Sequence, residues 1–240
     1  MFDQILHPQF HFSLETSLLL VILVALEAVL SADNAIALAA IAQGLKTPEQ
    51  QRRALNIGLV AAYVLRITLI FTATWVIDFW QVELLGAAYL LWLVFRYFTS
   101  SEDEQGHERN LEFSSLWQAI PMIAVTDLAF SLDSVTTAIA VAEDTWLIII
   151  GGTIGVITLR FLAGLFIRWL DEFTHLEDAG FVTVGFVGVR LLLKAVFPEL
   201  LVPEWLMISL IFGMFIWGFS KRNPDFIPPK EQKTEQSLEM

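Results

Sequence analysis

Cysteine is absent from this 240-residue chain, and charged residues make up only 17% of it. Without cysteine there is no disulfide framework, no thiolate-bound zinc, no iron–sulfur cluster and no thiol nucleophile. The net charge is -12, which argues against a nucleic-acid partner because no basic surface could neutralise phosphates. Hydrophobic residues make up 56% of the chain, too many for an ordinary soluble domain. The composition therefore predicts a polytopic membrane protein.

Common catalytic motifs are absent as well. The chain has no Gly-x-Ser-x-Gly, no His-Glu-x-x-His and no phosphate-binding glycine loop. All four histidines fall outside the long apolar segments or at their edges, where ordinary surface histidines are expected. Two aspartates inside apolar segments, Asp33 and Asp133, could share a proton as in an aspartyl protease, but nothing beside them specifically supports that chemistry. We therefore expect that the protein is not an enzyme.

Seven apolar segments are long enough to cross a bilayer, which takes roughly 20 mainly apolar residues. They predict an all-α fold with spanning helices at residues 15–42, 55–77, 82–99, 116–141, 146–169, 179–197 and 204–220. Together these segments are expected to form one transmembrane domain over residues 1–220. The tail at 221–240 is polar and contains prolines, so it is expected to be disordered.

The lysines and arginines set the expected orientation, because cytoplasmic loops carry an excess of both. Nearly all of the basic residues outside the span interiors fall on one side of the seven spans. They are Lys46, Arg52, Arg53, Arg96, Arg109, Arg168, Lys221, Arg222, Lys230 and Lys233. The other side has only Lys194 near its boundary. We therefore expect the N-terminus outside and the C-terminal tail in the cytosol.

One polar pattern occurs twice inside the apolar segments. Residues 27–34 and 127–134 both read acid-x-x-x-Ser-x-Asp followed by Asn or Ser. Carboxylates are costly in hydrocarbon, so an acid inside a membrane span is a functional candidate by default. The candidate ligands are Glu27, Ser31, Asp33 and Asn34 in the first copy, and Asp127, Ser131, Asp133 and Ser134 in the second.

These side chains offer only oxygen ligands, which suit hard divalent cations such as Mn²⁺, Ca²⁺ and Mg²⁺. Buried acids without counter-charge would not all stay ionised. Arg66 and Arg160, with Arg190 as a further candidate, are expected to compensate their charge. Proton exchange would then accompany cation binding and release. The opposing interpretation is that the acids and arginines form permanent salt bridges inside the membrane.

The spacing within each motif raises a geometrical problem. In a continuous helix, the first acid, the serine and the last Asn or Ser of each copy share one face. Asp33 and Asp133 lie about 120° away from that face, at 3.6 residues per turn. Either the helices unwind locally and free backbone carbonyls as ligands, or each aspartate reaches a partner on another helix, such as Arg66 or Arg160. The spacing leaves both open.

The two motifs belong to a longer repeat. A second match follows each motif, as Gly58 and Arg66 in one case and Gly152 and Arg160 in the other. Residues 15–99 and 116–197 are therefore expected to be two copies of a three-helix unit, with 204–220 as an extra helix. A unit of three spans enters its second copy from the opposite side of the membrane. Transporters with such inverted repeats place the substrate near the midplane, between the repeats.

The motif residues resemble the signature of the TerC family of integral membrane proteins. The resemblance covers about residues 15–197 and rests on Glu27 with residues 31–34, and on the run 127–134. Many members have Gly at the Ser31 position and Pro at the Thr136 position. The family is associated with tellurite resistance and Mn²⁺ export. Some of its members supply metal to exported proteins, and plastid members take part in thylakoid biogenesis.

By this resemblance, the expected function is export of a divalent cation, Mn²⁺ first among them, by alternating access around a midplane carboxylate site. Asp33, Asn34, Asp133 and Ser134 would be metal-site residues, with the first acid of each motif close by. The alternative is a non-transporting membrane scaffold, or a partner that delivers metal to exported or membrane proteins. The expected location is a bacterial-type cell membrane or a thylakoid. A homodimer or a membrane-protein partner is compatible with the sequence.

Overall fold

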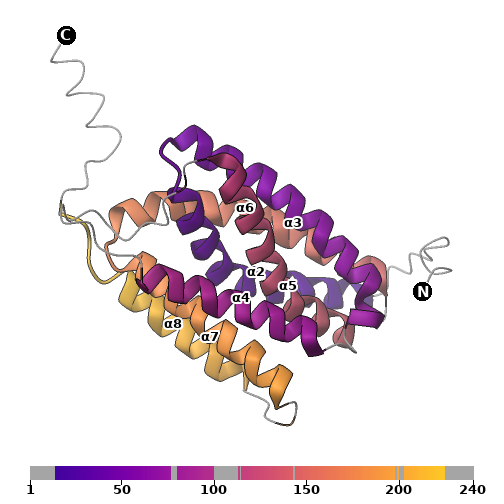
Figure 1. Cartoon of the computed structure of the whole chain (residues 1–240). Helices are drawn as coiled ribbons and strands as arrows, with labels where there is room; N and C mark the ends of the chain where they lie inside the picture. Colours follow the sequence, from indigo (N-terminus) through magenta and orange to yellow (C-terminus); the bar gives the residue numbers. More distant parts are fainter. Residues whose placement is uncertain are drawn as a thin grey trace.

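The computed structural model describes residues 14–76, 80–99, 113, 115–142, 144–197, 199 and 203–224. Seven helices account for most of these residues (Figure 1). They are α2 (Leu14–Gln43), α3 (Pro48–Val76), α4 (Trp80–Thr99), α5 (Leu116–Val141), α6 (Thr145–Glu172), α7 (Leu176–Val196) and α8 (Glu204–Gly218). Each coincides with one predicted span, although α3 begins several residues earlier than expected. The prediction of an all-α, polytopic membrane protein is confirmed.

Five of the helices are long and apolar enough to cross a membrane, namely α3, α4, α5, α6 and α7. The 15-residue α8 is also apolar but shorter, and so is the Asn34–Gln43 part of α2. The number of spans, the division into domains and the orientation of the termini remain predictions. The orientation of the termini depends partly on residues 1–13 and 225–240, which lie outside the described ranges.

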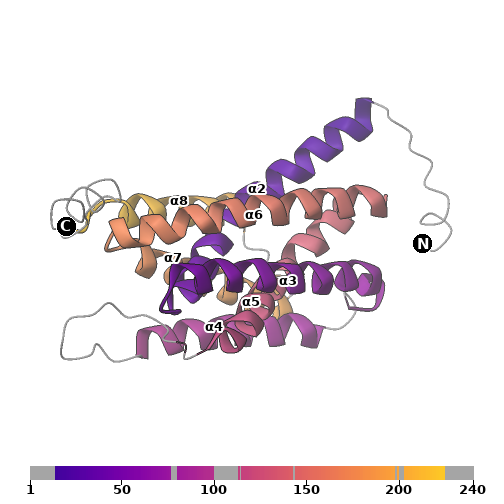
Figure 2. The ribbon, with the colours of Figure 1, turned by 90° about the horizontal axis from the view of Figure 1, so that it is seen from above.

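Two helix pairs run antiparallel. Asn56, early in α3, accepts a hydrogen bond from Arg160 late in α6, whereas Tyr63 further along α3 pairs with Thr153 earlier in α6. The α3 and α6 helices also lie side by side in Figure 2. Contacts of the same kind join α4 and α7: Glu83 with Lys194, and Tyr97 with Asp178. In both pairs, therefore, later residues of one helix meet earlier residues of the other.

Two other pairs run parallel. Contacts between α2 and α6 include those of Gly155 with Glu27 and of Gln43 with Ile167. Contacts between α3 and α5 include those of Gly58 with Ile123 and of Arg66 with Ser131. The α2 helix is parallel to α6, α6 is antiparallel to α3, and α3 is parallel to α5. It follows that α2 is antiparallel to α5. Each helix of the first three is thus antiparallel to its counterpart in the second three. An inverted repeat requires these directions, and the repeat predicted from the sequence agrees with them.

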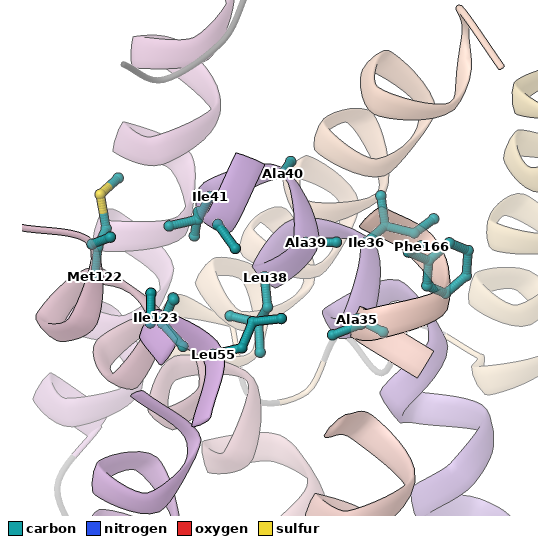
Figure 3. Close-up of a cluster of buried hydrophobic side chains, with 14 of the residues drawn as sticks. Ala35, Ile36, Leu38, Ala39, Ala40, Ile41, Leu55, Met122, Ile123 and Phe166 are labelled. Carbon is teal, nitrogen blue, oxygen red and sulfur yellow. The ribbon is translucent and has the colours of Figure 1, made fainter. Parts of the chain in front are cut away.

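The largest core cluster joins α2, α3, α4, α5, α6 and α7. Residues 35–42 of α2 are buried on every face of the helix, and five of these eight are alanine. Small side chains let neighbouring helices approach closely in a membrane protein. Figure 3 shows Leu38 of α2 beside Leu55 of α3, and Ile36 on the side of Phe166 of α6. The half of α2 that follows the first motif is therefore the centre of the bundle.

Gly180→Ala is expected to lower the melting temperature of the protein in detergent by several degrees. A Cβ on Gly180 would overlap the side chain of Ile36, whose own Cβ lies 3.1 Å away. Ile36 is 1% exposed and β-branched, so it has little room to move. Overpacking of this kind costs about 1–3 kcal/mol. Tryptophan fluorescence during heating measures the shift.

The matched control is Gly213→Ala in α8, where an added Cβ has nothing within 4 Å. This variant should melt like the wild type or slightly higher, because alanine favours helix by up to about 1 kcal/mol over glycine. Equal melting of the two alanine variants would contradict the tight contact between α2 and α7.

Candidate functional site

Acids from both motif copies meet at one buried arginine. The side chain of Arg66, on α3, is only 2% exposed and forms an ion pair with Glu27 of α2. Its second guanidinium nitrogen lies 3.7 Å from Oδ1 of Asp127, a fully buried residue of α5. Arg66 Nε also donates a hydrogen bond of 2.9 Å to the hydroxyl of Ser131, one turn after Asp127. The helices of the two predicted repeats are thus tied together through one guanidinium.

The charges in this cluster do not balance when both acids are ionised. Glu27 and Asp127 supply two carboxylates, and Arg66 supplies one guanidinium. Asp127 Oδ1 has no hydrogen-bond partner among the described residues, although Arg66 lies within ion-pair distance of it. An uncompensated charge is costly away from water. A bound cation or a proton would remove the excess negative charge.

Two glycines of α6 make room for the cluster. A Cβ on Gly155 would lie 2.8 Å from the carboxyl carbon of Glu27, which is too close for two carbon atoms. Gly152, one turn earlier, faces the Cδ atom of Arg66 at 3.7 Å from where its own Cβ would be. The side-chain-free face of α6 therefore lets a carboxylate and a guanidinium lie between three helices.

A small cavity adjoins the ion cluster. Glu27, Arg66 and Ser134 line it together with apolar residues of α3, α5 and α6. The cavity has about 20 Å³ available to the centre of a water-sized sphere, which is enough to hold a single water molecule. Ser134 is 6% exposed, and its hydroxyl donates a long hydrogen bond of 3.4 Å to the Ser131 carbonyl. The cavity thus brings a carboxylate and a hydroxyl from different motif copies to one small space.

Asp133 lies in a second charged cluster. Its Oδ2 accepts a hydrogen bond of 2.6 Å from Arg190 of α7, and its Oδ1 lies 3.4 Å from the Lys194 ammonium. Lys194 also pairs with Glu83 of α4 at 3.0 Å. The α5 helix is continuous, so the roughly 120° between Asp127 and Asp133 directs them to different helices. Of the two alternatives left open by the spacing, Asp133 follows the second, with partners on α7.

The remaining predicted residues are placed as follows. Ser31 and Asn34 are buried in α2, at 1% and 6% exposure. The side chain of Asp33 lies outside the described part of the structure. Arg160 donates a hydrogen bond of 2.5 Å to Asn56, and no ion pair joins it to any of the three motif acids whose side chains are described. No group of three or more His, Asp or Glu side chains in the described ranges is arranged to hold a metal ion.

The sequence analysis did not identify Glu83 as a partner of Lys194, and it placed Lys194 only near the end of a membrane span. One signal was available, because Arg190 and Lys194 are four residues apart and therefore share a helix face. Two basic residues on one face of an apolar span indicate a shared acidic partner. The identity of that partner was not available, since it depends on the antiparallel packing of α4 against α7.

Comparison with known proteins places the fold and the two motifs in a family. The family model "Integral membrane protein TerC family" matches residues 12–225. The chain is 36% identical over 201 residues to the uncharacterized membrane protein YceF of Bacillus subtilis, covering 80% of this chain and 77% of that protein. It is 33% identical over 229 residues to the uncharacterized membrane protein YkoY of the same organism, covering 85% and 69%.

A more distant relative comes from a plant. The thylakoid membrane protein TERC of Arabidopsis thaliana is 28% identical over 198 residues, which are 70% of this chain and 52% of that protein. No solved structure matches the chain.

Arg66→Gln is expected to destabilise the protein strongly, because it leaves two buried carboxylates without a counter-charge. Breaking a buried ion pair from one side costs about 3–5 kcal/mol. Adding Glu27→Gln and Asp127→Asn should recover much of the loss, since the triple variant buries no charge in this cluster. Melting in detergent compares the three proteins.

Arg53→Gln is the control, because its guanidinium pairs with Glu49 on the exposed surface. Exposed pairs contribute at most about 1 kcal/mol, so this variant should melt like the wild type. A triple variant as unstable as Arg66→Gln alone would contradict the charge imbalance.

Proposed function

Because the chain belongs to the TerC family of integral membrane proteins, we propose that it transports a divalent cation across the membrane, with Mn²⁺ as the cargo. One observation carries the proposal: Glu27 and Asp127, from the two motif copies, meet at buried Arg66. Carboxylate and hydroxyl oxygens suit Mn²⁺, Mg²⁺ and Ca²⁺. The association of the family with Mn²⁺ export supports Mn²⁺ as the cargo and export as the direction in this proposal.

In this proposal Arg66 balances the charge of one of the two carboxylates while no cargo is bound. The arriving cation enters the small cavity and takes the Glu27 carboxylate and the Ser134 hydroxyl, both of which line it. Arg66 then keeps Asp127 and Ser131 as its partners. The excess negative charge of the cluster attracts the cation, and protonation of a carboxylate weakens its hold on the cargo. Proton exchange is thus the proposed companion of cation release.

The second charged cluster supplies a connection that alternating access would break and remake. Glu83 belongs to α4 of the first predicted repeat, whereas Asp133 and Lys194 belong to helices of the second. In the expected orientation, the start of α4 and the end of α7 lie on the outer side. We propose that these ion pairs hold the two repeats together on that side while the site is closed to the outside.

Asp127→Asn is expected to slow Mn²⁺ flux strongly. The fold should stay intact, because Arg66 keeps Glu27 as its counter-ion. Purified protein in liposomes that enclose a Mn²⁺-quenched fluorophore measures the flux. Loss of a group that orients the site should reduce transport roughly tenfold or more. Glu49→Gln, which removes a carboxylate from the exposed surface, is the control and should transport like the wild type.

Two outcomes would contradict this proposal. If Asp127→Asn carries Mn²⁺ at the wild-type rate, the buried acid pair is not part of the pathway. The second outcome is a wild-type protein that carries no Mn²⁺ under any gradient. Transport would then be excluded, and the scaffold or metal-delivery function would take its place.

Mn²⁺ is also expected to raise the melting temperature of the wild-type protein but not that of Asp127→Asn. A ligand that binds only the native state adds about 2.7 kcal/mol at a hundred times its dissociation constant. Permanent salt bridges would instead give both proteins the same response to Mn²⁺. Parallel titrations with Mg²⁺ and Ca²⁺ identify the cargo, and a larger shift with either would replace Mn²⁺ in the proposal.

A further inference from the structure

A groove of about 390 Å³ lies between α3 and α6. Its walls include Val60 of α3 and Ile157 and Phe161 of α6, which are 66%, 53% and 76% exposed. In a membrane-spanning pair of helices, such side chains face lipid. At one end, the hydroxyls of Tyr63 and Thr153 pair with each other at 2.9 Å. The groove is therefore apolar along most of its length.

The opposite end of the groove is basic. Arg160 lines it and is held by the hydrogen bond that its Nε donates to Asn56. Its guanidinium passes over Gly164, one turn further along α6, where an added Cβ would lie 3.1 Å from a guanidinium nitrogen. Arg52 precedes Asn56 by one turn of α3, so it shares a helix face with Asn56 and lies toward the same end of the groove. Two positive charges thus gather at one end of an apolar groove.

No carboxylate contributes to the described lining of this groove. The nearby acid Glu49 is paired with Arg53 on the exposed surface. An arginine inside a membrane span normally pairs with an acidic side chain or with backbone carbonyls. Among the described residues, the polar partner of Arg160 is the neutral amide of Asn56, so an anion at this end of the groove would balance its positive charge.

The dimensions of the groove suit one leaflet of a bilayer. Its lining runs over residues 56–63 of α3 and 153–161 of α6, roughly 11 Å at 1.5 Å per residue. One leaflet contributes about 15 Å of hydrocarbon, half of the roughly 30 Å core. The basic end points toward Pro48, where α3 begins, which is the side expected to be cytosolic. The Arg160 side chain can extend toward that interface as long basic side chains do.

We propose that the groove between α3 and α6 binds an anionic phospholipid of the cytosolic leaflet. One acyl chain lies along the apolar walls, and the phosphate accepts hydrogen bonds from Arg160 and Arg52. Arginine binds phosphate oxygens through two parallel N–H groups. Basic pockets between spanning helices on the cytosolic side are suited to anionic headgroups. The bound lipid would contact both predicted repeats, since α3 and α6 belong to different ones.

A second copy of the chain matches the groove less well. In a twofold interface the same surface meets its own counterpart. Arg160 and Arg52 of one copy would then approach the same two positive charges of the other, without a carboxylate in the lining to offset them. An amphiphile with an anionic head and an apolar tail satisfies both ends of the groove at once.

Native mass spectrometry of the detergent-purified protein, titrated with phosphatidylglycerol or phosphatidylcholine, tests the site. The wild type should bind one phosphatidylglycerol roughly tenfold more tightly than phosphatidylcholine, as expected when charged hydrogen bonds are added. Arg160→Gln with Arg52→Gln should remove that preference. Val60→Trp should weaken binding of both lipids at this site, because the indole fills the groove while both arginines remain.

Arg53→Gln is the matched control, since it removes a neighbouring positive charge that pairs with Glu49, and it should keep the preference. Equal binding of the two lipids to the wild type would overturn the proposal, as would an unchanged preference in the double arginine variant. A protein that becomes dimeric through this groove and excludes lipid would overturn it too. Binding is read without Mn²⁺, so the result does not depend on transport.

Discussion

The burial of Arg66 between two carboxylates is the interaction on which the rest of the molecule depends. A guanidinium that is 2% exposed must find its partners inside the protein, because bulk water does not reach it. The partners come from α2 and α5, so these two helices and α3 must lie in one register. The glycine face of α6 then becomes necessary, since Gly155 leaves the space that Glu27 occupies. One ionic requirement thereby fixes the relative positions of four helices.

Close approach of the helices satisfies that requirement. The fully buried stretch 35–42 of α2 is rich in alanine, and Gly58, Gly155 and Gly180 each lie directly against a side chain of another helix. In a bilayer, packing has to come from such surfaces, because lipid tails are as apolar as the helices and no hydrophobic force draws helices together. The small residues and the charged residues are therefore parts of one arrangement. The small residues let the helix backbones approach closely. The charged residues allow only one relative position of the helices along their axes.

The helices themselves could be predicted from the sequence, because a stretch of apolar residues long enough to span a bilayer leaves the backbone few alternatives. The motif residues could also be found, since acids inside apolar segments stand out. The separation of Asp127 from Asp133 followed from helical geometry alone. Their partners did not follow from it. Which helix faces Asp133 depends on how α4, α5 and α7 pack. The matched positions of Arg66 and Arg160 predicted equal roles, whereas among the described residues Arg66 pairs with two motif acids and Arg160 bonds to Asn56.

That inequality has a consequence for how such a molecule would work. If the two halves were equivalent, the forms open to either side of the membrane would have the same energy, and neither would be preferred at rest. Arg66 is buried among acids, whereas its counterpart Arg160 bonds to a neutral amide beside a lipid-facing groove. If the two halves exchanged roles, Glu27 and Asp127 would lose the guanidinium of Arg66, and the guanidinium of Arg160 would be buried instead. Under the proposed transport, this difference between the two matching arginines would make one of the two forms the preferred one at rest.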